Sequence, residues 1–515
     1  ATWARQWIDG DNYDSLSRFF WTVSNGMYSI GGSTVTEWLE IPFNREQVLD
    51  MANMDKHLQA GKDRPFALFD KTKELCSAWA KHRGVPVNSK QVTLLNSERT
   101  AIFGRNNGIL ISPRLAFSSV LAHEMVHSLN IGHSYSERRT KIFPHAAPGE
   151  YGDRYDLMST ANAWMRPSRF GWAGPGLVGP HLDYLGWLPA NRMLYFGRNN
   201  PSPSREVRLS SLSLPHAVTT GHLLVLLPYD RDEPGNVYTV ELRTPVGNDA
   251  GIQQSAVVIH QVRRIGHAFY SFLVQHAGGY DELTEGTEWV RFIDNSSVIR
   301  VRVNRLVGWH DALLSVSSTF DPKSCREDEE RVPLRTVDSV KDVLADEEES
   351  EEQRLIDEVA RMPAAWNRSL GFSPLRFVCV EREENSTSNG TSPLSSLSYS
   401  YTHLRRQRAR QDFFRNRRTY GQNECVEGRV WRAIDPYDYV CVPPSRVMEA
   451  RRAGRVFIMA NGDCPEKLVP RQAFPSDRNC VSEHERALIL SENREAALHF
   501  KYASFFNGAD PLYTR

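Results

Sequence analysis

The sequence lacks the features that would place it among membrane-spanning or nucleic-acid-binding proteins. No run of about 18 or more apolar residues occurs within its 515 residues, so we expect no membrane span. Lysine plus arginine number 62 and aspartate plus glutamate also number 62, so no overall charge attracts nucleic acid or an anionic membrane. The first residues show no basic flank followed by an apolar core, and hence no signal peptide. We expect either a cytosolic chain or one whose leader has been removed.

Cysteine is nearly absent from the first 320 residues, where only Cys76 occurs. An even number of cysteines crowds the C-terminal part, which predicts disulfides without giving their pairing. Four Asn-x-Ser/Thr triplets are possible glycosylation acceptors. These features favour a secreted, disulfide-bearing glycoprotein. The C-terminal cysteines are Cys325, Cys379, Cys425, Cys441, Cys464 and Cys480, and the triplets begin at Asn295, Asn367, Asn385 and Asn389.

The C-terminal end, residues 421–515, contains an internal repeat. "CVEGRVWRAIDPYDYVCV" begins at Cys425 and "CPEKLVPRQAFPSDRNCV" begins at Cys464, and aligned without a gap they share eight of eighteen positions. Such self-similarity indicates a duplicated unit. Each unit is too short to sustain a large core, so cross-linking by cysteine would help it fold. Pro470 stands in the second unit where the first has Trp431, so the second unit is expected to be a structural partner.

The middle of the chain predicts strands followed by a linker. Short runs such as "HLLVLLPY", "VYTVELRT", "SAVVIHQV" and "SVIRVRV" are rich in valine and leucine, which predicts a β-sandwich-like domain over residues 191–320. Residues 321–420 contain an acidic block from Asp342 to Glu352 and the basic run "HLRRQRARQDFFRNRR". Blocks of like charge usually stay solvated, which favours a linker and an exposed helix face over nucleic-acid binding.

Residues 1–190 alternate helical and extended patterns. "QVTLLN" and "GILIS" read as buried strands. Ser112 and Pro113 predict the N-cap and first position of a following helix. Six apolar residues at helical spacing give that helix a face against the core. They are Leu115, Phe117, Val120, Leu121, Met125 and Leu129.

This helix carries the pattern H-E-x-x-H. Residues four apart lie on one helix face, so His123 and His127 can present imidazole nitrogens to a single metal ion. Glu124 lies between them, where it can take a proton from a water activated by the ion. A buried pair of structural histidines is the alternative interpretation of this short pattern. A third histidine, His133, makes that alternative less favourable.

His133 lies six residues after His127, too far to reach the same ion if the helix continued. The chain must leave the helix and turn back, which requires a residue in the left-handed conformation. Glycine adopts this conformation most easily, and asparagine is the next most tolerant residue. Asn130 occupies this position, at a cost of about 1 kcal/mol relative to glycine. We therefore expect a working three-histidine site.

The pattern resembles the metzincin zinc proteases, in particular the gametolysin-like branch. In these proteins H-E-x-x-H-x-x-G-x-x-H is followed by a "YGD…D-M" segment, and "EYGDRYDLMSTANAW" supplies Met158 twenty-five residues after His133. "HLDYLGWLP" and "FFWTVSNGMYSI" resemble their closing and opening segments. The resemblance covers roughly residues 15–190, with a weaker likeness across the β domain, and implies a metzincin-type catalytic domain with a twisted sheet and an active-site helix. The whole chain is thus predicted to be α+β, with this domain followed by the all-β domain and the duplicated module. Asn130 and Ser159 stand where the family has glycine.

Carried over by position, the resemblance implies that His123, His127 and His133 bind one catalytic Zn²⁺. Glu124 would be the general base and Met158 the Met-turn residue. Peptide hydrolysis would then proceed by direct attack of water, without a covalent acyl-enzyme.

Three further residues near this pattern have alternative roles. Asp153 and Asp156 could bind Ca²⁺ or orient a ligand histidine, although turn formation is favoured. Cys76 could be an inhibitory zinc ligand, although a buried thiol on an amphipathic helix is favoured.

The sequence thus predicts a secreted zinc endopeptidase acting on extracellular proteins or glycoproteins, with no nucleic-acid partner. One alternative is an inactive protease-like binding protein in which Asn130 misplaces His133 and the C-terminal modules carry the function. These modules resemble small cysteine-bearing modules of secreted microbial proteins. Another alternative is a zinc-dependent toxin that cleaves one intracellular protein.

Overall fold

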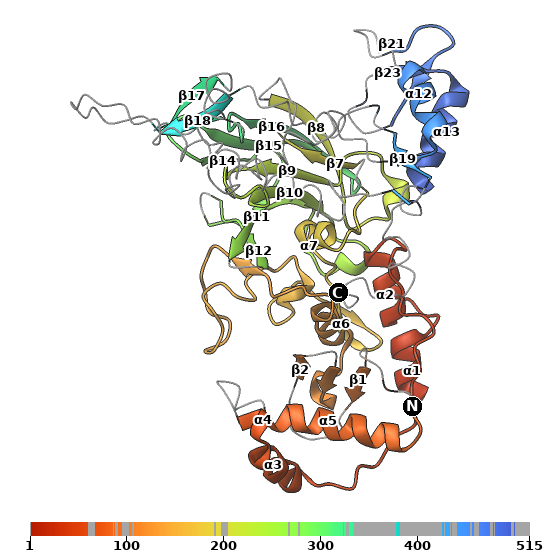
Figure 1. Cartoon of the computed structure of the whole chain (residues 1–515), viewed down its shortest axis with the longest axis vertical. Helices are drawn as coiled ribbons and strands as arrows, with labels where there is room; N and C mark the ends of the chain where they lie inside the picture. The colour runs from red at the N-terminus through yellow and green to blue at the C-terminus, as the bar shows by residue number, and fades with distance from the viewer. Residues whose placement is uncertain are drawn as a thin grey trace, which may run out of the picture.

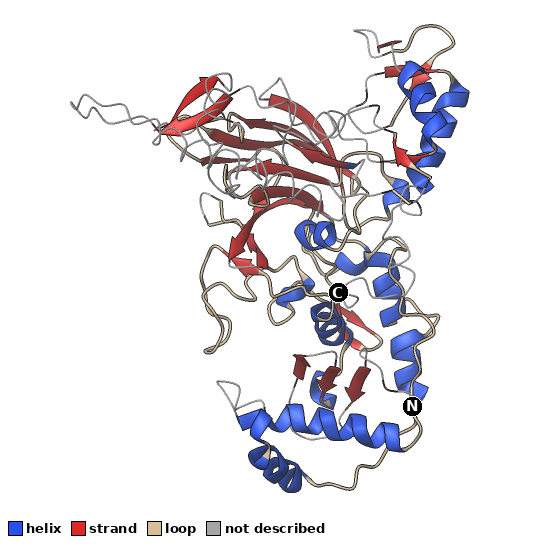
Figure 2. Ribbon diagram, viewed as in Figure 1, coloured by secondary structure: helices blue, strands red, loops and turns tan. Residues whose placement is uncertain are grey.

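The structure is a computed structural model that combines several helices with several β-sheets (Figure 2). It describes residues 2–59, 67–85, 87, 91–94, 102–105, 108–189, 192–196, 204–265, 268–276, 279–322, 324–325, 329–333 and 377–381, together with shorter stretches between 425 and 499. The expectation of a chain with both helices and sheets is confirmed at this level.

Five helices form the N-terminal part, and two of them begin at side-chain caps. The hydroxyl of Ser15 accepts a hydrogen bond from the backbone N–H of Arg18, and Asn44 forms a capping box with Gln47. Helix α5, which carries Cys76 as the interpretation from sequence expected, lies beside a small sheet (Figure 1). The helices are α1 (Thr2–Asp9), α2 (Leu16–Val23), α3 (Arg45–Met54), α4 (Lys56–Gln59) and α5 (Ala67–His82).

A small sheet leads into the helix with the H-E-x-x-H pattern. Strand β3 (Gly108–Ile111) lies between β1 (Gln91–Leu94), to which it is parallel, and β2 (Ile102–Arg105), to which it is antiparallel. Helix α6 (Ser118–His127) follows. The two strands expected from "QVTLLN" and "GILIS" are confirmed.

The predicted start of α6 is wrong. Ser112 precedes a 3₁₀ turn, Pro113–Leu115, rather than α6, and the N-cap of α6 is Phe117, which has no side-chain hydrogen bond. The proline ring suits the first position of a 3₁₀ turn as well as that of an α-helix, so the sequence signal fits both. Of the six residues of the predicted apolar face, Val120, Leu121 and Met125 lie on α6, and all six lie in or against the core cluster.

Two larger sheets pack face to face. One has the order β4-β12-β11-β10-β9-β7 with β13 paired to β11, and the other has the order β14-β15-β16-β8. One hydrophobic cluster takes side chains from both sheets, among them Val240, Ile259, Val301 and Leu314, which gives a sandwich arrangement. The strands are β4 (Tyr135–Ser136), β7 (Met193–Tyr195), β8 (Ser204–Ser210), β9 (Leu224–Pro228), β10 (Val237–Arg243), β11 (Ala256–Ile265), β12 (Ala268–Leu273), β13 (Glu282–Leu283), β14 (Glu288–Phe292), β15 (Val298–Val307) and β16 (Asp311–Ser318).

The larger sheet also packs against the N-terminal region. Along β9, Val225 and Leu227 face the sandwich core, whereas Leu224 and Leu226 join the cluster that contains α6. Strand β4, from the segment after α6, pairs in parallel with β12. The segments before and after residue 190 therefore share one sheet and one hydrophobic cluster.

Buried charges cover part of this sheet on the side of α7 (Gly179–Tyr184). The guanidinium of Arg243 lies 3.1 Å from the carboxylate of Glu241 and 2.6 Å from that of Asp249. The ring of His260 lies 2.9 Å from Asp153. Buried charges are tolerated only when paired, so this network holds the segment around Asp153 firmly against the sheet.

The C-terminal repeat forms two disulfide-linked units. Cys425 pairs with Cys441 and Cys464 pairs with Cys480, and Cys325 is also disulfide-bonded. The expected disulfides are thus confirmed for these cysteines. The elements are β19 (Val430–Trp431), β20 (Cys441–Val442), α12 (Pro444–Ala453), β21 (Val456–Phe457), β22 (Val469–Pro470), β23 (Asn479–Val481) and α13 (Glu483–Glu495).

The two units pack against each other through charged groups. From the first unit, the buried guanidinium of Arg432 lies 2.8 Å from Glu492 of α13, and Arg446 of α12 lies 2.6 Å from the same carboxylate. The second unit closes internally, because Arg471 pairs with Asp477 at 2.6 Å. The duplicated halves thus form one packed body.

Some expectations fall on residues outside the described part. They are the acidic block, the basic run and the triplets at Asn367, Asn385 and Asn389. Within residues 321–420, β17 (Glu329–Pro333) and β18 (Phe377–Glu381) pair in an antiparallel ribbon. The triplet at Asn295 lies in an exposed turn between β14 and β15.

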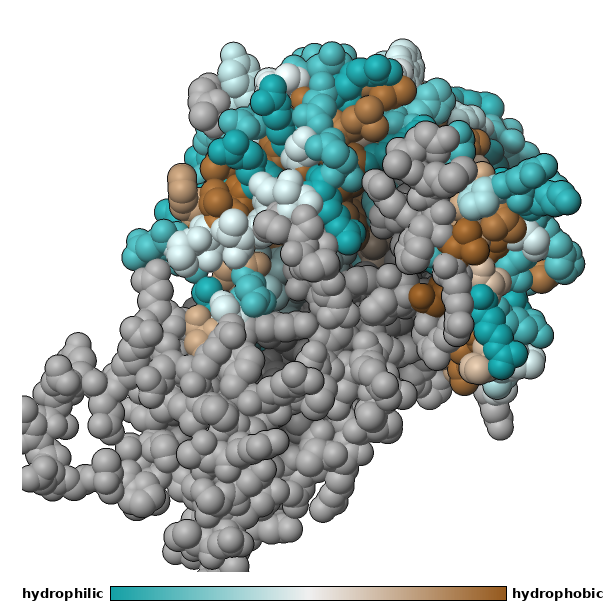
Figure 3. All heavy atoms as spheres, turned by 90° about the horizontal axis from the view of Figure 1, so that it is seen from above, coloured by the Kyte–Doolittle hydropathy of each residue, from teal (hydrophilic) through white to brown (hydrophobic). Residues whose placement is uncertain are grey.

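The described surface is mixed in character. In the view of Figure 3, hydrophilic residues make up most of the coloured surface, with smaller hydrophobic groups among them. Scattered exposed apolar side chains of this kind are normal for a folded protein. Within the part of the chain that the structure describes, no helix combines the length and apolar content needed to cross a membrane.

Candidate metal centre

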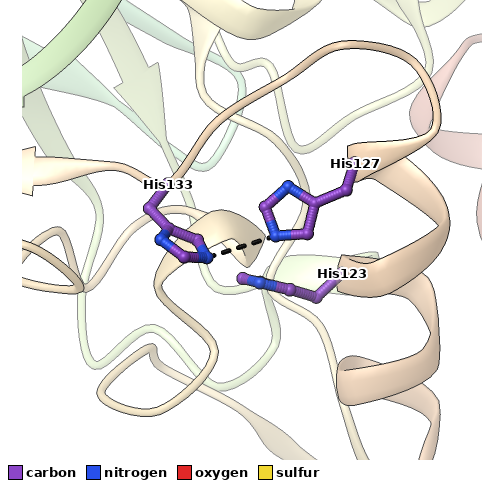
Figure 4. A group of neighbouring side chains, drawn as sticks. All are labelled: His123, His127 and His133. Carbon is purple, nitrogen blue, oxygen red and sulfur yellow. Dashed lines mark hydrogen bonds between the residues drawn. The ribbon is translucent and has the colours of Figure 1, made fainter. Parts of the chain in front are cut away.

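Three histidines meet at the end of α6. His123 and His127 project from one face of the helix, and His133 comes back towards them from the following segment (Figure 4). The helix ends at His127, and Asn130 then adopts φ of 60°, the left-handed conformation that the sequence analysis required. This single residue reverses the chain, so that His133 reaches the helix face.

The ligand atoms of the three rings lie close enough to share one ion. One nitrogen from each ring lies within 4.8 Å of the others, and the Nε2 atoms of His127 and His133 are 3.2 Å apart. Two nitrogens bound tetrahedrally to an ion at about 2.0–2.1 Å would be about 3.3 Å apart. The observed separation therefore fits a metal ion held by both nitrogens.

Each ring is oriented by a partner at its other nitrogen. The Nδ1 of His123 lies 3.0 Å from the carbonyl oxygen of Leu157, and that of His127 lies 2.8 Å from the carbonyl oxygen of Ile131. The Nδ1 of His133 lies 2.6 Å from the carboxylate of Glu150. These oxygens accept hydrogen bonds, so each Nδ1 carries the proton and donates it.

This arrangement leaves the three Nε2 atoms as lone-pair acceptors in the neutral rings. Two such lone pairs facing each other at 3.2 Å repel, and a cation between them removes the repulsion. Burial lowers the pKa of His123 well below its usual range, and the nearby His127 and His133 lower it further. Burial and His133 lower the pKa of His127 to about 4. Neutral imidazole, the form that binds metals, is thus favoured at neutral pH.

Glu124 lies beside the two helical ligands in a half-buried position. Burial alone raises the pKa of its carboxyl group to about 7, since no charged partner offsets the desolvation. A carboxyl group with a pKa near the working pH is suited to accept a proton and return it. The geometry of α6 thus combines two ligands with a general-base candidate.

Met158 lies in the buried 3₁₀ turn Leu157–Ser159. This turn contacts the metal centre through the carbonyl oxygen of Leu157, which accepts the hydrogen bond from His123. The carbonyl oxygen of Met158 accepts a hydrogen bond from the backbone N–H of Ser134, next to His133. The turn therefore contacts the cluster both at His123 on α6 and at the segment that carries His133.

Asp153 and Asp156 contact histidines outside the cluster instead of sharing an ion with it. Asp153 binds His260, and Asp156 lies 2.8 Å from the Nδ1 of His181 and accepts a hydrogen bond from the hydroxyl of Ser134. Burial raises the pKa of Asp156, but His181 and Ser134 lower it more, and the net direction is down. Among the described residues, the three histidines form the single group close enough to hold an ion.

Cys76 is not part of the cluster. It is a free, half-buried thiol on α5, and burial raises its pKa. The favoured interpretation of a packed thiol fits this environment.

Two residues of the site were missed by the sequence analysis. Glu150 orients His133, and the hydroxyl of Tyr151 lies 3.1 Å from the Nε2 of the same ring. Burial raises the pKa of Tyr151, with Glu150 and Glu124 raising it further, so the phenol stays protonated. Both residues stand in "EYGD", which was read only for its turn formers and its likeness to a family segment. Their contacts depend on how the segment folds back onto His133.

Comparison of the chain with protein-family models, curated proteins and solved structures finds no match. The interpretation of the site therefore rests on its own geometry.

Proposed function

We propose that the protein is a zinc-dependent endopeptidase. The observation that carries this proposal is the convergence of three imidazole nitrogens, each ring oriented by an acceptor at its Nδ1, beside the half-buried carboxyl group of Glu124. Three protein ligands and an open position are typical of a catalytic zinc site. A structural zinc site would have four protein ligands.

The three nitrogen ligands favour zinc or another transition metal over calcium and magnesium. Imidazole also suits copper, iron and nickel, whereas calcium and magnesium prefer oxygen. When bound, the ion would polarise the scissile carbonyl and lower the pKa of the attacking water. His123, His127 and His133 would hold it, and their Nδ1 contacts would keep the rings in place.

Glu124 would move the proton of the reaction. Its carboxylate would accept a proton from the water as the water attacks the carbonyl carbon, and would then donate that proton to the leaving amine. This chemistry needs no covalent intermediate on the protein.

We further propose that the protein acts outside the cell, on proteins or glycoproteins. The disulfides in the C-terminal units support this location, because disulfides persist in oxidising compartments. The exposed triplet at Asn295 is compatible with it.

The alternative, an inactive binding protein, assumes that Asn130 misplaces His133. The Nε2 of His133 lies 3.2 Å from the Nε2 of His127, which supports the enzyme over this alternative. The remaining support for the alternative is the presence of the C-terminal units, which gives no binding chemistry. We therefore favour the enzyme.

The test measures zinc content and casein cleavage on one preparation of the full chain. Glu124→Gln keeps the size of the side chain and removes its ability to accept the proton. We expect this variant to bind one zinc per chain and to cleave about 10²- to 10⁴-fold more slowly than wild type. Glu137→Gln is the matched control, because that carboxylate contacts Arg291 at 3.0 Å and not the histidines.

The other possible outcomes bear on different parts of the proposal. A wild-type protein that binds no zinc would overturn the metal site itself. Zinc binding with equal cleavage by wild type and Glu124→Gln would overturn the role of Glu124. Zinc binding with no cleavage of casein would be followed by a search for a single cleaved protein in a proteome, as a narrow-specificity enzyme requires.

A further inference from the structure

The hydroxyl group of Tyr151 contacts the histidine cluster at His133. Its oxygen lies 3.1 Å from the Nε2 of His133, the nitrogen that faces the metal position. The Tyr151 ring lies 4.2 Å from the ring of His133 and 6.4 Å from that of His123, measured between centroids. Tyr151 therefore contributes a neutral O–H donor on the inner side of the site, beside the metal ligands.

The backbone conformation of Tyr151 is energetically unfavourable. Tyr151 has φ of 61°, a conformation that costs a non-glycine residue about 1–2 kcal/mol. Its backbone N–H donates to the carbonyl oxygen of Ser134 at 2.9 Å, and Phe143 packs edge-on against its ring at 5.4 Å. Such strain persists only where the surroundings fix the residue, and it often marks a functional position.

The neighbouring glycines tighten the same loop. At Gly149, which has φ of 87°, an added Cβ would lie 2.4 Å from the carbonyl oxygen of Ser136. At Gly152 it would lie 2.7 Å from the carbonyl oxygen of Gly149. The backbone on both sides of Tyr151 is thus packed too closely for any larger residue, which fixes the backbone position from which the Tyr151 side chain projects.

The direction of the O–H group suggests what it does during the reaction. Without an ion, the lone pair of His133 Nε2 is its acceptor. An ion at the cluster uses that lone pair, and the hydroxyl is then free to donate to an oxygen of the substrate at the same place. In peptide hydrolysis, the oxygen that gains negative charge there is the carbonyl oxygen of the scissile bond.

We propose that Tyr151 is a catalytic residue whose hydroxyl donates a hydrogen bond to the scissile carbonyl oxygen as that oxygen becomes negative. The inference rests on the proposed peptidase function. No bond to Tyr151 is made or broken, and its proton stays on the phenol. Glu124 handles the proton of the water, whereas Tyr151 stabilises the oxyanion.

Tyr151→Phe removes the hydroxyl and keeps the ring that packs on His133 and Phe143. Removal of one oxyanion donor typically lowers kcat about 10²- to 10³-fold, and we expect this loss with KM nearly unchanged. Tyr155→Phe is the matched control, since Tyr155 lies in the same segment and is buried in a different cluster. It should keep the wild-type kcat.

A second readout does not depend on turnover. A phosphinic peptide carries a tetrahedral, negatively charged oxygen like that of the attacked carbonyl. Calorimetry on the zinc-loaded proteins should show that Tyr151→Phe weakens its binding by about the same factor as kcat/KM. Zinc affinity, measured by competition with a chelator, should stay within a factor of about two of wild type.

The outcomes separate this inference from the function on which it rests. If wild type cleaves peptides and Tyr151→Phe matches it in kcat and phosphinate binding, the inference is overturned and the peptidase stands. If Tyr151→Phe loses zinc affinity in step with activity, Tyr151 is a metal ligand and the inference is also overturned. If wild type binds no zinc or hydrolyses no peptide bond, the proposed function and the inference fall together.

Discussion

Substitution of Glu150 tests whether the histidine cluster is built to hold a metal ion. The Nδ1 atoms of His123 and His127 donate to backbone carbonyls, which no substitution removes. His133 depends on the Glu150 carboxylate at 2.6 Å. Glu150 is therefore the one orienting partner that mutagenesis can change.

The magnitude follows from the two hydrogen bonds that this carboxylate accepts. One oxygen of Glu150 faces His133, and the other accepts from the backbone N–H of Ala147 at 2.7 Å. A glutamine has a single oxygen, so Glu150→Gln can accept from only one of these groups and loses the charge. Loss of such a partner typically weakens metal binding about 10- to 100-fold, or about 1.4–2.7 kcal/mol.

Zinc affinity measured by chelator competition checks this prediction. Glu150→Ala, which accepts neither hydrogen bond, should weaken zinc at least as much as Glu150→Gln, and Glu137→Gln should leave it unchanged. Identical affinities for wild type and both Glu150 variants would refute the reasoning, because orientation of His133 would then not matter for the ion.

Two further predictions concern the turn after α6 and a buried histidine. Asn130→Gly should keep the wild-type zinc affinity, because glycine adopts φ of 60° freely. Asn130→Val should lower zinc affinity about tenfold, because the strained turn would relax and move His133. Chelator competition measures both affinities. Burial and Arg192 lower the pKa of His222 from 6.5 to about 3 in the folded protein. As the pH falls below about 6.5, His222 therefore takes up a proton in the unfolded chain but not in the folded one, and the free energy of unfolding decreases. His222→Gln should remove about 2 kcal/mol of the drop in unfolding free energy between pH 7 and pH 5, measured by urea unfolding at each pH.

Local sequence patterns were sufficient for the elements and for part of the site. The spacing of His123, Glu124 and His127 requires only the helical repeat, so these three positions follow from the sequence alone. The strand runs of the sandwich also follow from their own composition, as β9 and β10 illustrate. The left-handed turn at Asn130 follows from the need to bring His133 back.

The prediction from local sequence was wrong where one residue pattern is compatible with two kinds of helix. Ser112 and Pro113 form a good helix start, yet they begin a 3₁₀ turn, and α6 starts at Ser118 without a side-chain cap. Here packing of α6 against the core outweighs the capping preference, which amounts to about 1 kcal/mol.

The sequence by itself determined which residues could bind a metal ion and where the cysteines and strands lie. Only the tertiary structure decided that Glu150 and Tyr151 face His133, that Cys425 pairs with Cys441, and that the sheet carrying β9 also packs on α6. Helical and strand repeats are set by neighbours a few residues apart, and they leave their mark in the sequence. Contacts between distant segments depend on how the whole chain packs, and the residue types at either end do not specify them.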